Sequence, residues 1–465
     1  MMSLAMVLVG VYFLSGMALL LQGALQVSLI RSARRAVPTR EVDLPEVPPH
    51  LLVQLPLYNE EAVVTRLLDA VARLEWDGPM TVQILDDSTD STTDQVRQWL
   101  AAHPAERWHH LRRANRSGFK AGALMAGLEA APEAEWVAIF DADFVPPADF
   151  LQRAGKALNA DPQLAAVQGR WAHLNAGESA LTRVQAFNLD AHFTVEQQAR
   201  SYMGAWAAFN GTAGLWRRAA IADAGGWCAD TLAEDLDLSV RAHFKGWGIR
   251  YLDHVEAPAE LPTAFSAYAS QQHRWTSGGA GCARKHARTL LSNASGQRLR
   301  QGLGQLFSSS IHVPVWVMTT ASVPLVALES TTGGFGWVLP TGAVFAAALV
   351  VLVALYFEAH RRRGRQGAFA PRMIGMLLLG TGMTWRNVRA VWLGWVGRPG
   401  GFVRTPKGGA VDRTGRRLWP AEIGWSLYFT GGLALGACTG EWGLMPYHAL
   451  LAGGYGWVAA MAVRG

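Results

Sequence analysis

Long apolar segments flank a middle region in which short apolar runs alternate with amphipathic ones. Met1 to Ile30 contains no Asp, Glu, Lys, Arg or His, and about 20 such residues suffice to cross a bilayer. Positive charges follow this segment, at Arg31, Arg34, Arg35 and Arg40. Because positive flanks favour the cytoplasmic side, we expect a retained anchor over residues 1–35, with the next domain in the cytoplasm.

The last third, residues 301–465, repeats the apolar pattern. Four further spans are predicted, at Leu306–Leu328, Trp337–Phe357, Ile423–Cys438 and Leu444–Val463. Met373–Val396 is apolar but carries Arg386 and Arg389, and a full crossing would put the basic loop 398–417 outside. We therefore expect an interfacial or re-entrant helix pair there, giving five spans, with a sixth as the alternative.

The middle region, residues 36–300, has the periodicity of an α/β domain. Leu51–Leu55, Val82–Leu85 and Trp136–Phe140 are short apolar runs closed by polar residues, as buried strands are. Glu61–Leu74 has apolar positions at helical spacing. The alternation predicts a Rossmann-like, mostly parallel sheet with helices on both faces, whose ligands bind beyond the carboxyl ends of the strands.

Composition supports a membrane protein with modest charge. Half of the 465 residues are hydrophobic, 19 are Trp, and the formal net charge is +6. The basic residues cluster beside apolar segments, so they indicate membrane topology, and we expect no nucleic-acid partner. Cys228, Cys282 and Cys438 have no metal-ligand spacing, which favours free thiols in a reducing compartment.

Two acidic motifs follow predicted strands. Asp141 and Asp143 come just after a buried run, where two carboxylates suit Mg²⁺ or Mn²⁺ together with diphosphate oxygens. An Asp-x-Asp sequence alone would equally suit an ordinary acidic turn. Asp86 and Asp87 follow another strand and suit a nucleotide or the metal site, with helix capping as the alternative.

Further candidates lie between these motifs and the second apolar region. Lys120 stands among small residues and suits a phosphate, although a lone Lys is usually solvated. Glu234 and Asp235 begin a predicted helix and suit a general base, or merely the helix dipole. Candidate acceptor contacts, each with a structural alternative, are Gly211, Thr212, Glu234, Gln271, Arg274 and Trp275.

Taken in order, these motifs resemble the processive family 2 glycosyltransferases with the GT-A fold, especially cellulose-synthase-like mannan synthases. The similarity covers roughly residues 50 to 280 and includes Val167–Trp171, Leu189–Phe193, Phe209–Gly214 and Gln271–Trp275. Residues 402–407 resemble the family's gating loop at Phe402, Thr405 and Lys407, although Arg404 replaces an expected small residue.

The resemblance implies a role for each candidate. Asp86, Asp87, Lys120 and Asp141 are expected at the nucleotide and phosphates, Asp141 and Asp143 at the metal, and Asp235 as the base. The family reaction would transfer a hexose from UDP- or GDP-hexose with inversion to a growing β-glycan. Alternatives are a non-processive enzyme that glycosylates a diacylglycerol or ceramide, and a non-catalytic nucleotide-sugar-binding protein. Either enzyme would contact membrane lipids, and we expect the bacterial inner membrane.

Overall fold

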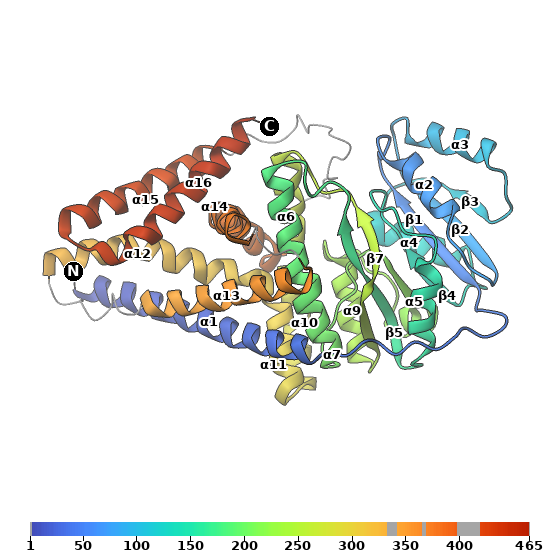
Figure 1. The fold of residues 1–465 in the computed structure, drawn as a ribbon, viewed down its shortest axis with the longest axis horizontal. Coiled ribbons are helices and arrows are strands. Elements are labelled where there is room, and N and C mark those ends of the chain that lie inside the picture. The colour runs from blue at the N-terminus through green and yellow to red at the C-terminus, as the bar shows by residue number, and fades with distance from the viewer. Residues whose placement is uncertain (1, 333–341, 365–368, 398–418, 465) are drawn as a thin grey trace.

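The computed structural model describes residues 2–332, 342–364, 369–397 and 419–464, which form an α/β domain beside a bundle of long helices (Figure 1). The predicted gating residues Phe402, Thr405 and Lys407 lie outside the described residues. The strands are β1 (Leu51–Leu57), β2 (Met80–Asp86), β3 (Trp108–Leu111), β4 (Trp136–Ile139), β5 (Leu164–His173), β6 (Gly214–Arg217) and β7 (Gly248–Ala259).

The helices of the α/β domain alternate with these strands. They are α2 (Val64–Ala72), α3 (Thr92–Ala102), α4 (Phe119–Glu129), α5 (Phe150–Asn159), α6 (Ala180–Ala191), the π-helix η1 (His192–Gln197), α7 (Gln198–Tyr202), α8 (Arg218–Asp223), α9 (Glu234–Phe244) and α10 (Phe265–Asn293). The remaining helices are α1 (Met2–Arg35), α11 (Gly296–Leu306), η2 (Ser308–Ile311), α12 (His312–Thr332), α13 (Gly342–Arg362), α14 (Phe369–Trp395), α15 (Trp419–Thr439), η4 (Trp442–Leu444) and α16 (Met445–Arg464).

The seven strands form one sheet in the order β3-β2-β1-β4-β6-β5-β7. Only β6 is antiparallel to its neighbours, so the predicted mostly parallel sheet is confirmed. Side chains of β1 alternate between two buried clusters: Leu51, Val53 and Leu55 face α2, α3 and α5, whereas Leu52 faces α4, α8 and α9. Helices therefore cover both faces of the sheet, as expected.

A buried amide pair fixes α4 on the sheet. Gln54 of β1 donates to Gln83 Oε1 of β2 and to the carbonyl of Leu124, both at 3.1 Å, and Gln83 donates to the carbonyl of Gly127 at 2.8 Å. A Cβ on Gly127 would lie 2.4 Å from Gln54 Nε2, so α4 approaches this closely because glycine stands there. These contacts hold the second and third turns of α4 against the sheet, and the first turn of the same helix carries Lys120.

The helical region contains the segments predicted as spans. Of the described helices, two are long and apolar enough to cross a bilayer, at Ala5–Arg35 and Ser308–Thr331. α1 packs against α12 through apolar side chains such as Val9, Leu19 and Met318. The predicted spans Ile423–Cys438 and Leu444–Val463 overlap α15 and α16. The predicted span Trp337–Phe357 overlaps α13 from residue 342 onwards, while residues 337–341 lie outside the described residues, and the count of five stays a prediction.

α14 corrects the expectation of a helix pair, because Phe369–Trp395 forms one continuous helix (Figure 1). Its glycines do not break it but allow close packing: a Cβ on Gly382 would lie 2.3 Å from the carbonyl oxygen of Gly454 in α16. Arg386, which interrupts the apolar pattern, binds the buried Glu422 of α15 at 2.7 Å. Figure 1 shows α14 nearly end-on while α1, α13 and α15 run across the view, so α14 crosses their direction.

Candidate active site

A cleft lies where the carboxyl ends of β1, β2 and β4 meet the start of α9 and the first half of α10. Ten of the residues singled out from the sequence line it: Asp87, Lys120, Asp141, Asp143, Gly211, Glu234, Asp235, Gln271, Arg274 and Trp275. Ligands of parallel α/β sheets bind at this edge, because successive strands all deliver their ends there. The structure therefore brings these ten residues together in one cleft, and their roles stay predictions.

Asp86 and Thr212 do not line the cleft but support it. The Asp86 side chain is buried, and its oxygens accept hydrogen bonds from Ser88 N at 2.9 Å, Thr93 Oγ1 at 2.7 Å and His110 Nε2 at 2.9 Å. Burial alone would raise the pKa of Asp86, but these hydrogen bonds lower it to about 2. Thr212 is buried too, and its Oγ1 accepts the backbone N–H of Asp141 at 2.8 Å. Direct ligand contact by either side chain is therefore not supported.

One wall of the cleft combines aromatic and guanidinium groups. Arg113 forms a two-pronged ion pair with Asp87, with Nε to Oδ1 at 3.0 Å. The Arg116 guanidinium lies 3.2 Å from the centroid of the Tyr58 ring. Neither arginine was predicted from the sequence. The basic stretch from Arg112 to Arg116, just before Lys120, is the sequence feature that could have indicated them.

The turns that form this wall are tied together. Asn59 has a φ of 57°, a left-handed conformation, and its backbone N–H donates to Ser88 Oγ at 2.9 Å. Asn59 Oδ1 accepts the backbone N–H of Thr89 at 2.8 Å. These bonds join the turn after β1 to the turn after β2, and so they hold Tyr58 beside Asp87.

Lys120 lies at the centre of the cleft's charges. Its Nζ binds Asp141 Oδ1 at 2.6 Å and the carbonyl of Gly211 at 2.9 Å, and lies 4.0 Å from Glu234 Oε1. Burial would lower the pKa of Lys120, but Asp141 and Glu234 raise it above its usual value. The ammonium group is thus charged and held where an incoming phosphate can compete for it.

Glu234 and Asp235 are adjacent carboxyl groups at the start of α9. Burial raises the pKa of both, and the neighbouring Glu234 adds to the effect on Asp235, whose pKa rises to about 7. A carboxyl group with such a pKa can take up a proton near neutral pH, as a general base must. Gly211, with a φ of +81°, lies against it, because a Cβ there would be 2.9 Å from Asp235 Oδ2.

Arg274 brings positive charge into the cleft from α10. Burial lowers its pKa, while the carboxylates of Glu234, Asp141, Asp143 and Glu60 act in the opposite direction. A guanidinium keeps its charge in such surroundings, so Arg274 offsets this acidic group. Trp275, the next residue, keeps 38% of its surface exposed, and its ring lies 6.2 Å from that of Trp171.

A second cavity of about 370 Å³ lies beyond Asp235, on the side of the long helices. Asp235, Trp171 and Trp275 line both the cleft and this cavity. Its far wall includes Gln26 of α1 and Leu355 and Tyr356 of α13. Asp235, whose pKa is raised, thus lies between the charged cleft and the second cavity, which extends to the helical region.

Comparison with known proteins agrees with this geometry. Residues 48–278 match the family model described as glycosyltransferase like family 2. Glucomannan 4-beta-mannosyltransferase 7 of Arabidopsis thaliana is 43% identical over 253 residues, which are 52% of this chain and 45% of that protein. Glucomannan 4-beta-mannosyltransferase 1 of Oryza sativa subsp. japonica is 44% identical over 255 residues, 53% of this chain and 48% of that protein.

The match spans about half the length of these curated relatives. A solved structure, the mannosyltransferase PcManGT from Pyrobaculum calidifontis in complex with GDP-Man and Mn²⁺, has a TM-score of 0.55 and 23% identity to this chain. The similarity covers 80% of this chain and 99% of that one. At this identity the likeness concerns the fold, and it agrees with the expected GT-A architecture.

Proposed function

Because the chain carries a family 2 glycosyltransferase domain like that of the plant mannan synthases, we propose that it is a membrane-bound, inverting synthase that transfers mannose from GDP-mannose to a growing β-glycan. The observation that carries this proposal is the position of Asp235, which lines both cavities. A base at such a junction can take a proton from an acceptor on one side while the donor lies on the other. The choice of mannose rests on the named activities of the relatives.

In this proposal the cleft binds the donor. Tyr58, Asp87 and Arg116 form the wall against which the nucleotide lies, and Lys120 exchanges its bonds to Asp141 and Gly211 for phosphate oxygens. Arg274 supplies a second positive charge to the diphosphate. The carboxylates of Asp141 and Glu234, which Lys120 now neutralises, become free to bind a cation or the sugar.

A divalent cation fits the cleft. Asp141 and Asp143 both line it, and no group of three or more His, Cys, Asp or Glu side chains among the described residues forms a complete metal site by itself. Mg²⁺ and Mn²⁺ commonly take one or two protein carboxylates and complete their shell with phosphate oxygens and water. When bound, the cation would offset the charge that develops on the departing nucleoside diphosphate.

The acceptor enters through the second cavity. Trp171 and Trp275, which line both cavities, offer ring faces to a sugar, and Gln271 on the cleft side offers an amide to the hydroxyls that reach it. Asp235 takes the proton of the acceptor hydroxyl, whose oxygen attacks the anomeric carbon opposite the leaving diphosphate. A single displacement converts an α-linked donor into a β-linked product.

The membrane setting belongs to the proposal as well. The catalytic domain, residues 36–300, would face the cytoplasm because basic residues follow the first apolar segment. The second cavity would then deliver the product towards α1 and α13. The relatives named above are plant proteins, so they give the expected bacterial inner membrane no support.

A donor screen tests the proposal. The full chain in detergent or nanodiscs would be incubated with GDP-mannose, GDP-glucose, UDP-glucose and UDP-galactose, each with a manno-oligosaccharide acceptor or with membrane lipid. We expect release of GDP from GDP-mannose, growth of a β-linked glycan, and loss of both when a chelator is present. A glycosylated lipid as the sole product would exclude the synthase, and no nucleotide release with any donor would exclude an enzyme of this class.

A further inference from the structure

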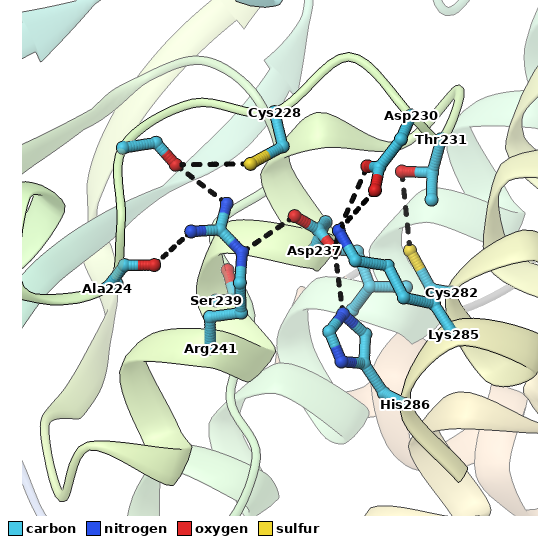
Figure 2. Close-up of polar contacts among 12 residues, drawn as sticks. Ala224, Cys228, Asp230, Thr231, Asp237, Ser239, Arg241, Cys282, Lys285 and His286 are labelled. Carbon is cyan, nitrogen blue, oxygen red and sulfur yellow. Dashed lines mark hydrogen bonds and ion pairs between the residues drawn. The ribbon is translucent and has the colours of Figure 1, made fainter. Parts of the chain in front are cut away.

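A network of charged side chains joins the start of α9 to α10 (Figure 2), and none of its members lines the cleft. Its centre is Asp237, two residues after Asp235, and its side chain is fully buried. Asp237 Oδ1 accepts hydrogen bonds from Lys285 Nζ and His286 Nε2, each at 2.7 Å. Both donors belong to α10, so the network joins two helices.

The second oxygen of Asp237 is bound from its own helix. Arg241 Nε donates to Asp237 Oδ2 at 2.8 Å, and the same guanidinium donates to the carbonyls of Ala224 and Gly226 in the turn after α8. Lys285 also binds Asp230, at 2.8 Å, in the segment that leads into α9 (Figure 2). The carboxylate therefore has charged or polar partners at both oxygens, which holds it in one orientation.

A second contact holds the same pair of helices together at the start of α9. A Cβ on Gly278 of α10 would lie 2.8 Å from the Cβ of Ala233, so α10 runs directly against the residue that precedes Glu234. Cys282, one turn later, is buried with its Sγ 3.6 Å from the Ala233 carbonyl oxygen. The catalytic end of α9 thus rests on α10 over two turns.

α10 carries the acceptor side of the proposed site on the same rigid element. Trp275 precedes Lys285 by about three turns of one uninterrupted helix, Phe265–Asn293. A continuous α-helix keeps its length, since every backbone N–H in its interior is bonded to the turn before it. Whatever fixes Lys285 and His286 against α9 therefore also fixes Trp275 relative to Asp235.

We propose that Asp237 is a positioning residue: its bonds to Lys285 and His286 set the distance between the base on α9 and the acceptor-binding residues on α10. This inference rests on the proposed function, because it assigns Asp235 and Trp275 to one reaction. Asp237 does not line either cavity, so it acts through the two helices and not by touching substrate.

The inference predicts a loss that depends on the acceptor. A glycan hydroxyl is held by α10, so it cannot follow a base that has shifted with α9. A water molecule is free to move with the base. Weakening the network should therefore impair transfer to a glycan far more than hydrolysis of the same donor, because a shift of about 1 Å can cost on the order of 100-fold in rate.

The experiment compares these two rates in the full chain. GDP release from GDP-mannose would be measured with and without a β-1,4-manno-oligosaccharide, for the wild type and for Asp237→Asn, His286→Leu and His286→Gln. We expect the ratio of transfer to hydrolysis to fall about tenfold or more in Asp237→Asn and His286→Leu. His286→Gln should keep most of the wild-type ratio of transfer to hydrolysis, because the glutamine amide can still donate to Asp237 Oδ1.

Asp69→Asn is the matched control, because Asp69 accepts a hydrogen bond from Trp99 Nε1 at 2.7 Å far from both helices. The ratio of transfer to hydrolysis in Asp69→Asn should equal that of the wild type. If Asp237→Asn does not fold, the comparison of His286→Leu with His286→Gln decides. Equal ratios of transfer to hydrolysis in these two variants would overturn the inference. An unchanged ratio in a folded Asp237→Asn would do the same. A wild type inactive with every donor would instead reject the proposed function, and the inference with it.

Discussion

At the scale of single residues, the site depends on which way neighbouring side chains point. Asp86 and Asp87 are consecutive, yet Asp86 is buried among Ser88, Thr93 and His110, whereas Asp87 faces the cleft. Asp235 and Asp237 divide in the same way, one facing the cleft and one facing α10. In each pair one carboxylate lines the cleft, and the other is buried and bound by neighbouring side chains.

The pKa of Asp235 leads to a pH prediction. Only the deprotonated carboxylate can act as a base, and burial beside Glu234 raises its pKa to about 7. The kcat/KM for transfer should therefore be constant above that pH and fall about tenfold per unit below it. An aspartate with the ordinary pKa of 3.8 would leave the rate constant down to about pH 5.

Asp235→Asn should reduce transfer by about 10²–10⁴, with donor affinity nearly unchanged, because it removes a base and not a phosphate contact. Donor affinity would be measured by titration with GDP-mannose in the absence of acceptor. Turnover close to that of the wild type would exclude Asp235 as the base. A profile that stays flat between pH 5 and 8 in the wild type would do so independently.

Gly211 provides a second test at this scale. Its φ of +81° costs a residue with a Cβ about 1–2 kcal/mol, and that Cβ would also press on Asp235 Oδ2 at 2.9 Å. Gly246 has a φ of +90° and nothing within 4 Å of the added atom. We expect Gly211→Ala and Gly246→Ala to lose similar thermal stability, while only Gly211→Ala loses kcat. Equal activity of the two folded variants would show that Gly211 serves the turn alone.

At the scale of elements, the spacing of apolar residues predicted the regular strands and helices, but not the features that depend on contacts with residues distant in the chain. The strands before Asp87 and Asp141 were foreseen because a buried parallel strand is a continuous apolar run. The continuity of α14 was missed, because Arg386 and Arg389 were expected to keep this segment from crossing the bilayer as one helix. In the structure Arg386 binds the buried Glu422 of α15 at 2.7 Å, and Glu422 lies 36 residues further along the chain, so the local sequence does not reveal the pair.

The packing of α14 can be tested with two of its own glycines. A Cβ at Gly382 would lie 2.3 Å from the Gly454 carbonyl oxygen, so Gly382→Ala should lower stability by about 1–3 kcal/mol. A Cβ at Gly380 would meet nothing within 4 Å, so Gly380→Ala should be neutral or stabilise by up to about 1 kcal/mol. Thermal unfolding in detergent compares them, and equal effects would contradict the close crossing of α14 and α16.

At the scale of the whole molecule, the catalytic domain and the long helices meet around the second cavity. Glu358 of α13 is buried and binds Arg34 of α1 at 2.9 Å, and Arg362 on the next turn donates to the carbonyl of Ala33. Arg363, just beyond α13, lies 3.7 Å from Asp190 of α6. These contacts join residues 173 to 329 positions apart, which is why the sequence alone did not predict the second cavity.

Trp275 stands where the two cavities meet, so its replacement should separate their functions. Trp275→Ala removes a ring that is partly exposed and packed near Trp171, whereas Asp87, Arg116 and Lys120 on the donor side remain. We expect the KM for a manno-oligosaccharide to rise about five- to 150-fold, since stacking on an aromatic ring contributes about 1–3 kcal/mol. The affinity for GDP-mannose should change little.

Trp275→Phe is the control, because it keeps a ring face of smaller area and should fall between the wild type and Trp275→Ala. A ring needed mainly for folding would instead lower expression and thermal stability in both variants without separating donor from acceptor. A loss of GDP-mannose affinity with unchanged acceptor dependence would assign Trp275 to the donor side. The second cavity would then have no demonstrated role in binding the glycan, and the path from Asp235 towards α1 and α13 would have to be sought elsewhere.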